Sequence, residues 1–275
     1  MTPESTSRGG ELAKRHRRST RLWHWLNAFA VVILLMSGLT IFNAHPRLYW
    51  GQFGANQDAA FLEISSSPTS GNLRIGDWRI ETTGLLGNWR DSDGNVQRRA
   101  FPGWATIPSR YNLALARRWH IFFAWLLGIS LAAYLAWSLA NRHMIRDLSP
   151  RASELHPRHL WHDIKQHALL RFPTGAAALR YNILQKLAYL AVLVLLLPVL
   201  VLTGMTMSPG LNAAWPWLLD VFGGRQSARS LHFMGALLMV LFVVVHLLMV
   251  LLAGPFNEIR SMITGNYRLP KERKP

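Results

Sequence analysis

The sequence predicts an all-α integral membrane protein: a bundle of four transmembrane helices with an outer loop region that contains short β structure. Three observations lead to this fold class. Half of the 275 residues are hydrophobic and only 16% are charged. The hydrophobic residues collect in four blocks of about 20 residues without Asp, Glu, Lys or Arg, the length that a helix needs to cross the hydrocarbon core. Lys and Arg instead gather in the segments that join alternate blocks.

The four blocks divide the chain into nine consecutive parts. The expected order is a basic cytoplasmic tail (1–22), a first span (23–43), a periplasmic insert (44–118), a second span (119–140), a cytoplasmic amphipathic connection (141–184), a third span (185–207), a periplasmic loop (208–231), a fourth span (232–253) and a cytoplasmic tail (254–275). The first span exceeds a signal-peptide core and lacks a small-x-small cleavage site, so we expect it to be retained. The third span contains Pro198 and no histidine, and is expected to serve as scaffold.

The distribution of Lys and Arg predicts the orientation. Segments 1–22, 141–180 and 255–275 hold 18 of them in 83 residues, whereas segments 44–118 and 207–231 hold 11 in 100. Because cytoplasmic loops carry the excess of basic residues, both termini are expected in the cytoplasm. The formal net charge of +16 is then mainly a topology signal and an attraction to anionic lipid. No basic face on a soluble fold is evident, so nucleic acid is not an expected partner.

The outer segments show structure but no catalytic pattern. "LRIGDWRIETTG" alternates apolar and polar residues around Gly-Asp, which predicts a β-hairpin, and "SDGNV" predicts a further turn. No nucleophile–base pair, glycine-rich phosphate loop or metal-spaced cluster is found there, so no catalytic residue is expected and the insert is interpreted as a docking surface. No internal repeat and no low-complexity tract is evident.

Histidine is the residue that carries chemistry in the spans. The chain has no cysteine, which excludes thiolate-ligated clusters and c-type haem, so a redox metal would need histidine ligands. Four histidines lie inside the spans: His24, His120, His232 and His246. The last two are 14 residues apart, roughly 21 Å of helix rise and within about 40° of one direction, so both leave one face of the helix at opposite depths. Gly235 lies on this face and would allow a bulky group to approach.

Sorting the four histidines by depth gives two pairs. His120 and His232 belong to the outer half of the bilayer, and His24 and His246 to the inner half. Interfacial or hydrogen-bonded core histidines are the simpler interpretation for a single residue, but polar residues in hydrocarbon are costly and usually functional. Two bis-histidine haem b groups, one near each side of the membrane, explain all four residues.

Other histidines compete less well. His45 and His143 lie at the ends of the first two spans and could replace a ligand if the helix limits were a turn different, but interfacial positions are favoured. The inner loop "HPRHLWHDIKQH" holds His156, His159, His162 and His167. An amphipathic helix on the membrane surface is favoured there over metal binding.

"RLWHWLNAFAVVILLMSGL" resembles the opening helix of the bacterial di-haem cytochrome b subunits of formate dehydrogenases, nickel-iron hydrogenases and thiosulfate reductases. "RRWHIFFAWLLG" and the two-histidine last helix resemble later spans of that family, so all four helices are covered. "IFNAHPRLYWG", "FPGWATIPS" and "FGGRQSARSLHF" resemble the thiosulfate reductase branch. The long outer insert departs from compact members.

This resemblance implies haem ligation by the four histidines in the pairs above. It also implies a location in the bacterial inner membrane and electron transfer between the quinone pool and a periplasmic molybdopterin oxidoreductase subunit, with quinone as substrate.

The chemistry of haem and quinone suggests further residues that could bind these groups. Four arginines that flank the ligands are candidates to bind haem propionates: Arg21, Arg117, Arg118 and Arg229. An equally good interpretation is that they are the basic residues that ordinarily flank membrane spans. Asn27, one turn from His24, is a candidate to bind quinone, with helix packing equally or better supported.

Two other functions stay open. One is a quinone-linked redox enzyme that works without a partner, of the superoxide oxidase or transmembrane reductase type. It would need a small-molecule site on the outer face. The other is a haem-free membrane anchor or transporter. It would leave the four histidines unexplained, and the sequence shows no inverted pair of broken helices.

Overall fold

The computed structural model describes residues 10–55, 57–170, 178–179 and 181–269. The chain divides into two compact units, which are described separately. Unit 1 comprises residues 1–26, 130–196 and 239–275, and unit 2 comprises residues 27–129 and 197–238.

Four helical stretches are long and apolar enough to cross a membrane, which confirms the predicted fold class. They are α1 (Arg18–Phe42), α2 (Leu113–Ala140), the run Ile183–Met207, and α8 (Arg225–Ala253). Only a minority of the residues in each stretch are buried, as is expected when lipid is the solvent. Each helix begins before the apolar block that predicted it. A helix satisfies the hydrogen bonds of its own backbone, so it can continue past the last residue that faces lipid. Long Arg side chains in such an extension can reach water.

The third stretch is not a regular α-helix throughout. It consists of α4 (Ile183–Leu190), the π-helical turn η4 (Ala191–Leu196) and α5 (Leu197–Met207). Pro198 has no backbone N–H to donate to the preceding turn, and the wider turn lies directly before it. At the start of α4, Asn182 and Gln185 form a reciprocal capping box that satisfies two backbone N–H groups.

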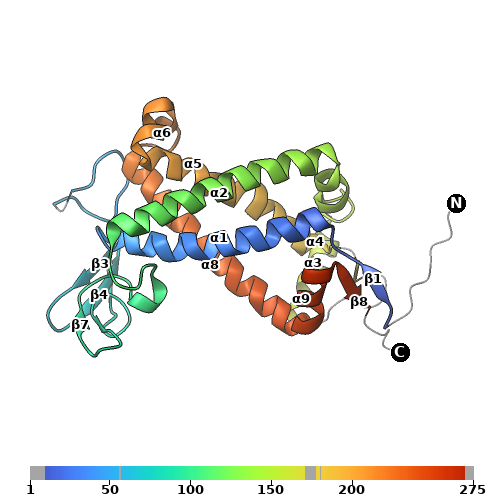
Figure 1. Ribbon diagram of the computed structural model, residues 1–275, viewed down its shortest axis with the longest axis horizontal. Coiled ribbons are helices and arrows are strands. Elements are labelled where there is room, and N and C mark those ends of the chain that lie inside the picture. Colours follow the sequence, from blue (N-terminus) through green and yellow to red (C-terminus); the bar gives the residue numbers. More distant parts are fainter. Residues whose placement is uncertain (1–9, 56, 171–177, 180, 270–275) are drawn as a thin grey trace. The chain divides into compact units, whose positions relative to one another are not determined.

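The insert between α1 and α2, in unit 2, contains the predicted β structure. Strands β2 (Arg47–Leu48), β3 (Leu62–Ser66), β4 (Gly71–Ile75) and β5 (Trp78–Glu81) form an antiparallel sheet in that order. The predicted hairpin is confirmed as β4 and β5, which turn at Gly76. The "SDGNV" turn is also confirmed, since it joins β6 (Trp89–Arg90) to β7 (Val96–Gln97). These strands lie together in the insert (Figure 1).

A small core attaches the insert to the helices of unit 2. Phe42 at the end of α1 packs with Leu48, Ile64 and Ala100 of the insert, and Phe233 of α8 stacks on Phe42 with ring centroids 4.2 Å apart. The remaining short helices of this unit are η1 (Gly103–Ala105), α6 (Pro209–Ala214) and α7 (Trp217–Val221).

The start of α8 is capped by the insert. The carbonyl oxygen of Gly51 accepts hydrogen bonds from the backbone N–H groups of Gln226 and Ser227, at 3.0 and 3.1 Å. The side-chain oxygen of Gln52 accepts from the N–H of Arg225 at 2.9 Å. These are N–H groups of the first helical turn, which have no partners within the helix. The insert therefore fixes the beginning of the helix that carries two of the four span histidines.

Unit 1 collects the basic ends of the chain. Strand β1 (Leu12–Lys14) pairs with β8 (Asn266–Arg268) in antiparallel register, so the two ends of the described chain lie side by side (Figure 1). Arg15 forms a salt bridge of 2.9 Å with Glu258 of helix α9 (Pro255–Thr264). The connection expected to be amphipathic contains the π-helical turn η2 (Met144–Leu148) and helix α3 (Pro157–Ala168).

Candidate functional site

The histidines of unit 2 form one facing pair. His120 of α2 and His232 of α8 have ring centroids 6.2 Å apart, with ring planes at 62°. Both rings are half-buried. These are the two residues that sequence reasoning assigned to the outer half of the membrane, and the structure brings them together.

Each ring of this pair is held by a hydroxyl group. Ser37 Oγ of α1 lies 3.0 Å from His120 Nδ1. Thr203 Oγ1 of α5 lies 3.1 Å from His232 Nδ1. Both hydroxyl-bearing residues are fully buried, so these contacts are shielded from water and fix the ring orientations.

A glycine follows each hydroxyl-bearing residue and makes room for the ring. A Cβ atom added to Gly38 would lie 3.3 Å from Cε1 of His120, and one added to Gly204 would lie 3.4 Å from Cε1 of His232. The Cβ at Gly38 would be closer than an ordinary contact, whereas the Cβ at Gly204 would just reach van der Waals distance, so the absence of a side chain matters most at Gly38.

The histidines of unit 1 form a second facing pair. His24 of α1 and His246 of α8 also have ring centroids 6.2 Å apart, at 53°. Aromatic rings support both: Trp25 packs edge-on against His24 at 5.2 Å, and Phe242 stacks on His246 at 5.8 Å. The buried Nδ1 atom of His24 has no hydrogen-bond partner within the described part of the chain.

Each pair has the separation that one iron ion needs between two imidazoles. Ring bonds of about 1.3–1.4 Å place a ring nitrogen about 1.2 Å from the ring centre. With metal–imidazole bonds of about 2.0–2.1 Å, two rings on opposite sides of one ion have centroids about 6.4 Å apart. The observed separation is 6.2 Å in both pairs. The two histidines of each pair would therefore suit the binding of a haem iron.

The arginines proposed for propionates differ in their surroundings. Arg117 and Arg118 are exposed at the start of α2. Arg229 is instead engaged by the insert, because it donates to the carbonyl oxygens of Arg47 at 2.8 Å and His45 at 2.5 Å. Arg21 donates to the carbonyl oxygen of Ile263 in unit 1, while its buried Nε has no partner among the described residues. Arg21 thus keeps one donor for an anionic group, whereas Arg229 mainly joins helix and insert.

The two competing histidines have other partners, and Asn27 lies one turn from His24. Asn27 is buried in α1. His45 stacks on Tyr49 at 5.7 Å, and burial, followed by the nearby Arg229 and Arg47 charges, lowers the pKa of His45. His143 contacts Asp147, with Nδ1 2.5 Å from the carboxylate. Neither histidine faces another imidazole in the ring contacts of the described chain.

The histidine-rich loop has structural partners. His156 caps α3 by accepting from the N–H of Arg158 at 3.4 Å. His159 lies 3.9 Å from Asp163, and His167 contacts the side chain of Asn182 at 3.2 Å. Among the residues that the structure describes, no group of three or more His, Asp or Glu could hold a metal ion.

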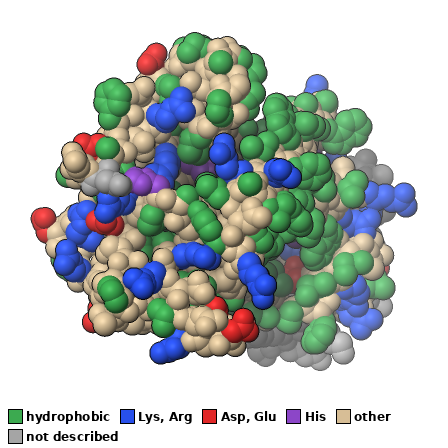
Figure 2. All heavy atoms as spheres, turned by 60° about the vertical axis from the view of Figure 1, so that its left-hand side comes forward, with side chains coloured by type: hydrophobic (Ala, Val, Ile, Leu, Met, Phe, Trp, Pro, Cys, Tyr) green, Lys and Arg blue, Asp and Glu red, His purple; other side chains and the backbone are tan. Residues whose placement is uncertain are grey.

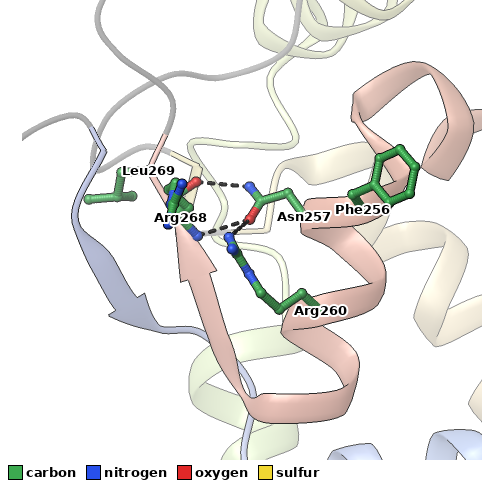
Figure 3. A pocket seen from close by; sticks show the side chains of 5 residues that line it. All are labelled: Phe256, Asn257, Arg260, Arg268 and Leu269. Atoms are coloured by element: carbon green, nitrogen blue, oxygen red, sulfur yellow. Dashed lines mark hydrogen bonds between the residues drawn. The ribbon is translucent and has the colours of Figure 1, made fainter.

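Two hollows in unit 1 carry polar groups. One has a volume of about 450 Å³ and is lined by both charges and histidines, among them His16, His143, Asp147, Glu154 and Lys186. The other, of about 390 Å³, lies beside α9 (Figure 3). There Asn257 accepts from Arg260 at 2.5 Å and donates to the carbonyl oxygen of Arg268 at 2.8 Å. These contacts fasten α9 to β8, and this hollow contains none of the paired histidines.

The sequence profile described as prokaryotic cytochrome b561 matches residues 15–265, which is nearly the whole chain. The chain belongs to the prokaryotic cytochrome b561 family. It is a cytochrome b561-type membrane electron-transfer subunit, and this family binds haem b. With its four apolar helices, this cytochrome b561 member is a multi-pass bacterial membrane protein.

The chain is similar to two curated relatives. It is 27% identical to a putative protein-methionine-sulfoxide reductase subunit YedZ1 of Azospira oryzae, over 93% of this chain and 98% of the relative. It is 23% identical to a probable Ni/Fe-hydrogenase B-type cytochrome subunit of Azotobacter vinelandii, over 60% of this chain and 73% of the relative. No solved structure matches the chain significantly.

Sequence reasoning missed the residues that hold the outer histidines. The signal is a short repeat: "LLMSGLT" at 34–40 and "LVLTGMT" at 200–206 share Leu, a hydroxyl residue, Gly and Thr at the same spacing. The repeat was overlooked because it spans only seven residues of two apolar helices. In the third span, Thr203 contacts His232 directly, and a Cβ atom added to Gly204 would lie 3.4 Å from its ring.

Proposed function

We propose that this cytochrome b561 member is a di-haem b subunit that carries electrons between the membrane quinone pool and a periplasmic redox partner. The observation that carries the proposal is the presence of two histidine pairs with the same 6.2 Å ring separation, one in each unit. Bound haem would supply one-electron chemistry, and the protein supplies ligation, spacing and access.

The residues of each pair would do distinct work. His120 and His232 would hold one iron, with Ser37 and Thr203 orienting their rings. His24 and His246 would hold the other between aromatic side chains. Oxidation of a quinol releases two electrons and two protons, so a quinone site needs both an electron acceptor and a route to water. The polar hollow of unit 1, with His143 and Asp147 in contact, offers proton-accepting groups on the side with the excess of Lys and Arg.

The outer insert supports a partner on the other side. β5 is an edge strand whose four residues are all exposed, and an exposed edge can pair with a strand from another chain. Large aromatic side chains are also exposed on the insert: Trp50, Phe53, Trp78 and Trp104. Figure 2 shows the basic side chains on this face scattered singly among polar and hydrophobic ones. Such mixed surfaces with aromatic residues are typical of protein interfaces.

The nature of the partner is the finer part of the proposal. Both relatives are named as subunits of redox enzymes, a reductase and a hydrogenase. The resemblance of the outer segments to the thiosulfate reductase branch favours a molybdopterin-dependent oxidoreductase. Purification of the intact complex from its native membrane, followed by determination of molybdenum, tests this part. A partner that contains nickel and iron instead of molybdenum would contradict it.

Haem stoichiometry tests the central claim. We expect a pyridine haemochrome assay on the purified chain to give two haem b per chain. His246→Ala and His232→Ala should each reduce the ratio to one and leave different spectra, because they remove different pairs. His159→Ala changes an exposed histidine of α3 and should retain both haems. A folded wild-type chain without haem would contradict the proposed function.

A further inference from the structure

The two histidines of unit 2 are held in matching cradles. In each cradle a hydroxyl residue contacts the ring Nδ1, and the ring Cε1 lies 3.3 or 3.4 Å from the place that a Cβ atom of the following glycine would occupy. The cradle on α1 consists of Ser37 and Gly38, and the cradle on α5 consists of Thr203 and Gly204. Two unrelated helices that present the same pair of groups to two histidines indicate a shared chemical role.

The direction of the hydroxyl hydrogen bonds determines which ring nitrogen carries hydrogen. Thr203 Oγ1 lies 2.6 Å from the carbonyl oxygen of Val199, a strong contact in which only the hydroxyl can donate. Ser37 Oγ likewise donates to the carbonyl oxygen of Leu34, at 3.3 Å. With the single hydrogen of Thr203 directed at Val199, its oxygen accepts from His232, and the matching arrangement of Ser37 assigns the same direction at His120. Both rings therefore carry hydrogen on Nδ1 and keep the lone pair on Nε2.

This tautomer has a consequence for a metal ligand. A histidine that donates its Nδ1–H becomes a more basic ligand through Nε2, and such hydrogen bonds fix the orientation of the ring. A more basic ligand stabilises the ferric state relative to the ferrous state. It therefore lowers the reduction potential of the iron.

The His24 and His246 pair in unit 1 lacks such hydroxyl contacts among the described residues. The buried Nδ1 of His24 has no hydrogen-bond partner there, and the ring contacts of both histidines are with aromatic side chains. The hydroxyl cradles thus distinguish one pair from the other.

We infer that Ser37 and Thr203 are positioning residues that hold the outer histidines as Nδ1–H tautomers and thereby lower the reduction potential of the haem bound between His120 and His232. This inference rests on the proposed function, because it requires haem at that pair. It assigns to the two hydroxyls a tuning role that the family assignment does not contain.

The test is a redox titration of the purified, haem-loaded chain, monitored by the haem α-band. Ser37→Ala and Thr203→Val should each shift one of the two potentials upward and leave the other unchanged. The same variants should bind the outer haem about 10–100-fold more weakly. In a His246→Ala background only the outer haem remains, so the shifted transition can be assigned directly. Ser37→Thr and Thr203→Ser keep the hydroxyl and should restore the wild-type potential.

Thr206→Val is the matched control. Thr206 is as buried as Thr203 and lies one turn further along α5, but its hydroxyl contacts the carbonyl oxygen of Thr203, to which it donates, instead of a histidine ring. It should leave both potentials unchanged. An unchanged potential in Ser37→Ala and Thr203→Val, with two haems bound, would overturn this inference and leave the proposed function standing. A downward shift would mean that the hydroxyls donate to the rings, and would also overturn it. A wild-type chain without haem would overturn the proposed function and this inference together.

Discussion

At the scale of single residues, the site depends on groups that are small. Gly38 and Gly204 let the two outer imidazoles lie against helix backbones, and Ser37 and Thr203 supply hydroxyl groups without bulk. Larger side chains at these places would occupy the space of the rings, because membrane helices approach closely only where residues are small.

Gly38→Ala tests this packing. In an isolated helix the change would be stabilising by about 1 kcal/mol, so any loss must come from contact with His120. The new Cβ would lie 3.3 Å from the ring, and we expect the imidazole to be displaced by a few tenths of an ångström, with weaker binding of the outer haem. Gly128→Ala is the control, because its Cβ would meet only Val201 at 3.8 Å. Haem content and absorption spectrum measure both, and identical behaviour would contradict the packing argument.

His16 predicts a pH dependence of stability in unit 1. Burial, together with Arg15 and other positive groups, lowers the pKa of His16 from 6.5 to about 4. Because the folded-state pKa is depressed, the neutral ring contributes stability above pH 6.5, and this contribution is lost as the pH falls through the folded-state value. The loss is at most about 3 kcal/mol, from 1.36 kcal/mol per pKa unit.

Thermal unfolding in detergent between pH 7.5 and 4 measures this effect. The midpoint should fall more steeply for the wild type than for His16→Gln, which cannot titrate. Parallel curves for the two proteins would show that protonation of His16 does not contribute.

At the scale of elements, the connection between the insert and the start of α8 positions His232. Arg229 lies one turn before His232, donates to two carbonyl oxygens of segment 45–47, and lies 5.5 Å from the ring of Phe42. Ser230 donates to the carbonyl oxygen of Tyr49 at 2.7 Å. The beginning of this membrane helix is therefore fixed by polar contacts with the insert, in addition to apolar packing.

Arg229→Met tests the role of this connection. Methionine keeps much of the apolar volume but removes two hydrogen bonds from a charged group to part-buried carbonyl oxygens, each worth about 1.5–3 kcal/mol. We expect a lower unfolding temperature and preferential loss of the outer haem, with the inner haem retained. Arg110→Met removes an exposed charge of the insert and should change neither quantity. Equal loss of both haems in Arg229→Met would contradict a local role.

At the scale of the whole molecule, the sidedness of the membrane remains a prediction from the distribution of Lys and Arg. The chain has no cysteine, so single cysteines can report it without background. Asp93→Cys lies in an exposed turn of the insert and Arg158→Cys on the exposed surface of α3. A membrane-impermeant maleimide should label Asp93→Cys in spheroplasts, and Arg158→Cys only after the membrane is opened. The reverse pattern would place both termini outside.

The sequence by itself determined the fold class, the family and the four span histidines. Length and absence of charge are sufficient to recognise a membrane helix, since every backbone group must be satisfied within it. Histidine in such a helix is rare enough to be noticed. The hairpin at Gly76 was also readable, because its turn chemistry is local.

Only the tertiary structure decided which groups contact the rings of His120 and His232. Ser37 lies 83 residues from His120 and Thr203 lies 29 residues from His232, and a hydroxyl in an apolar helix ordinarily bonds to its own backbone. Nothing in the chain near either histidine indicates these contacts. The same holds for Arg229, which the sequence offers equally as a propionate ligand or a flanking charge, and which the fold directs to the carbonyl oxygens of the insert. Ligand identity follows from residue type, whereas orientation and tuning follow from which helices pack together.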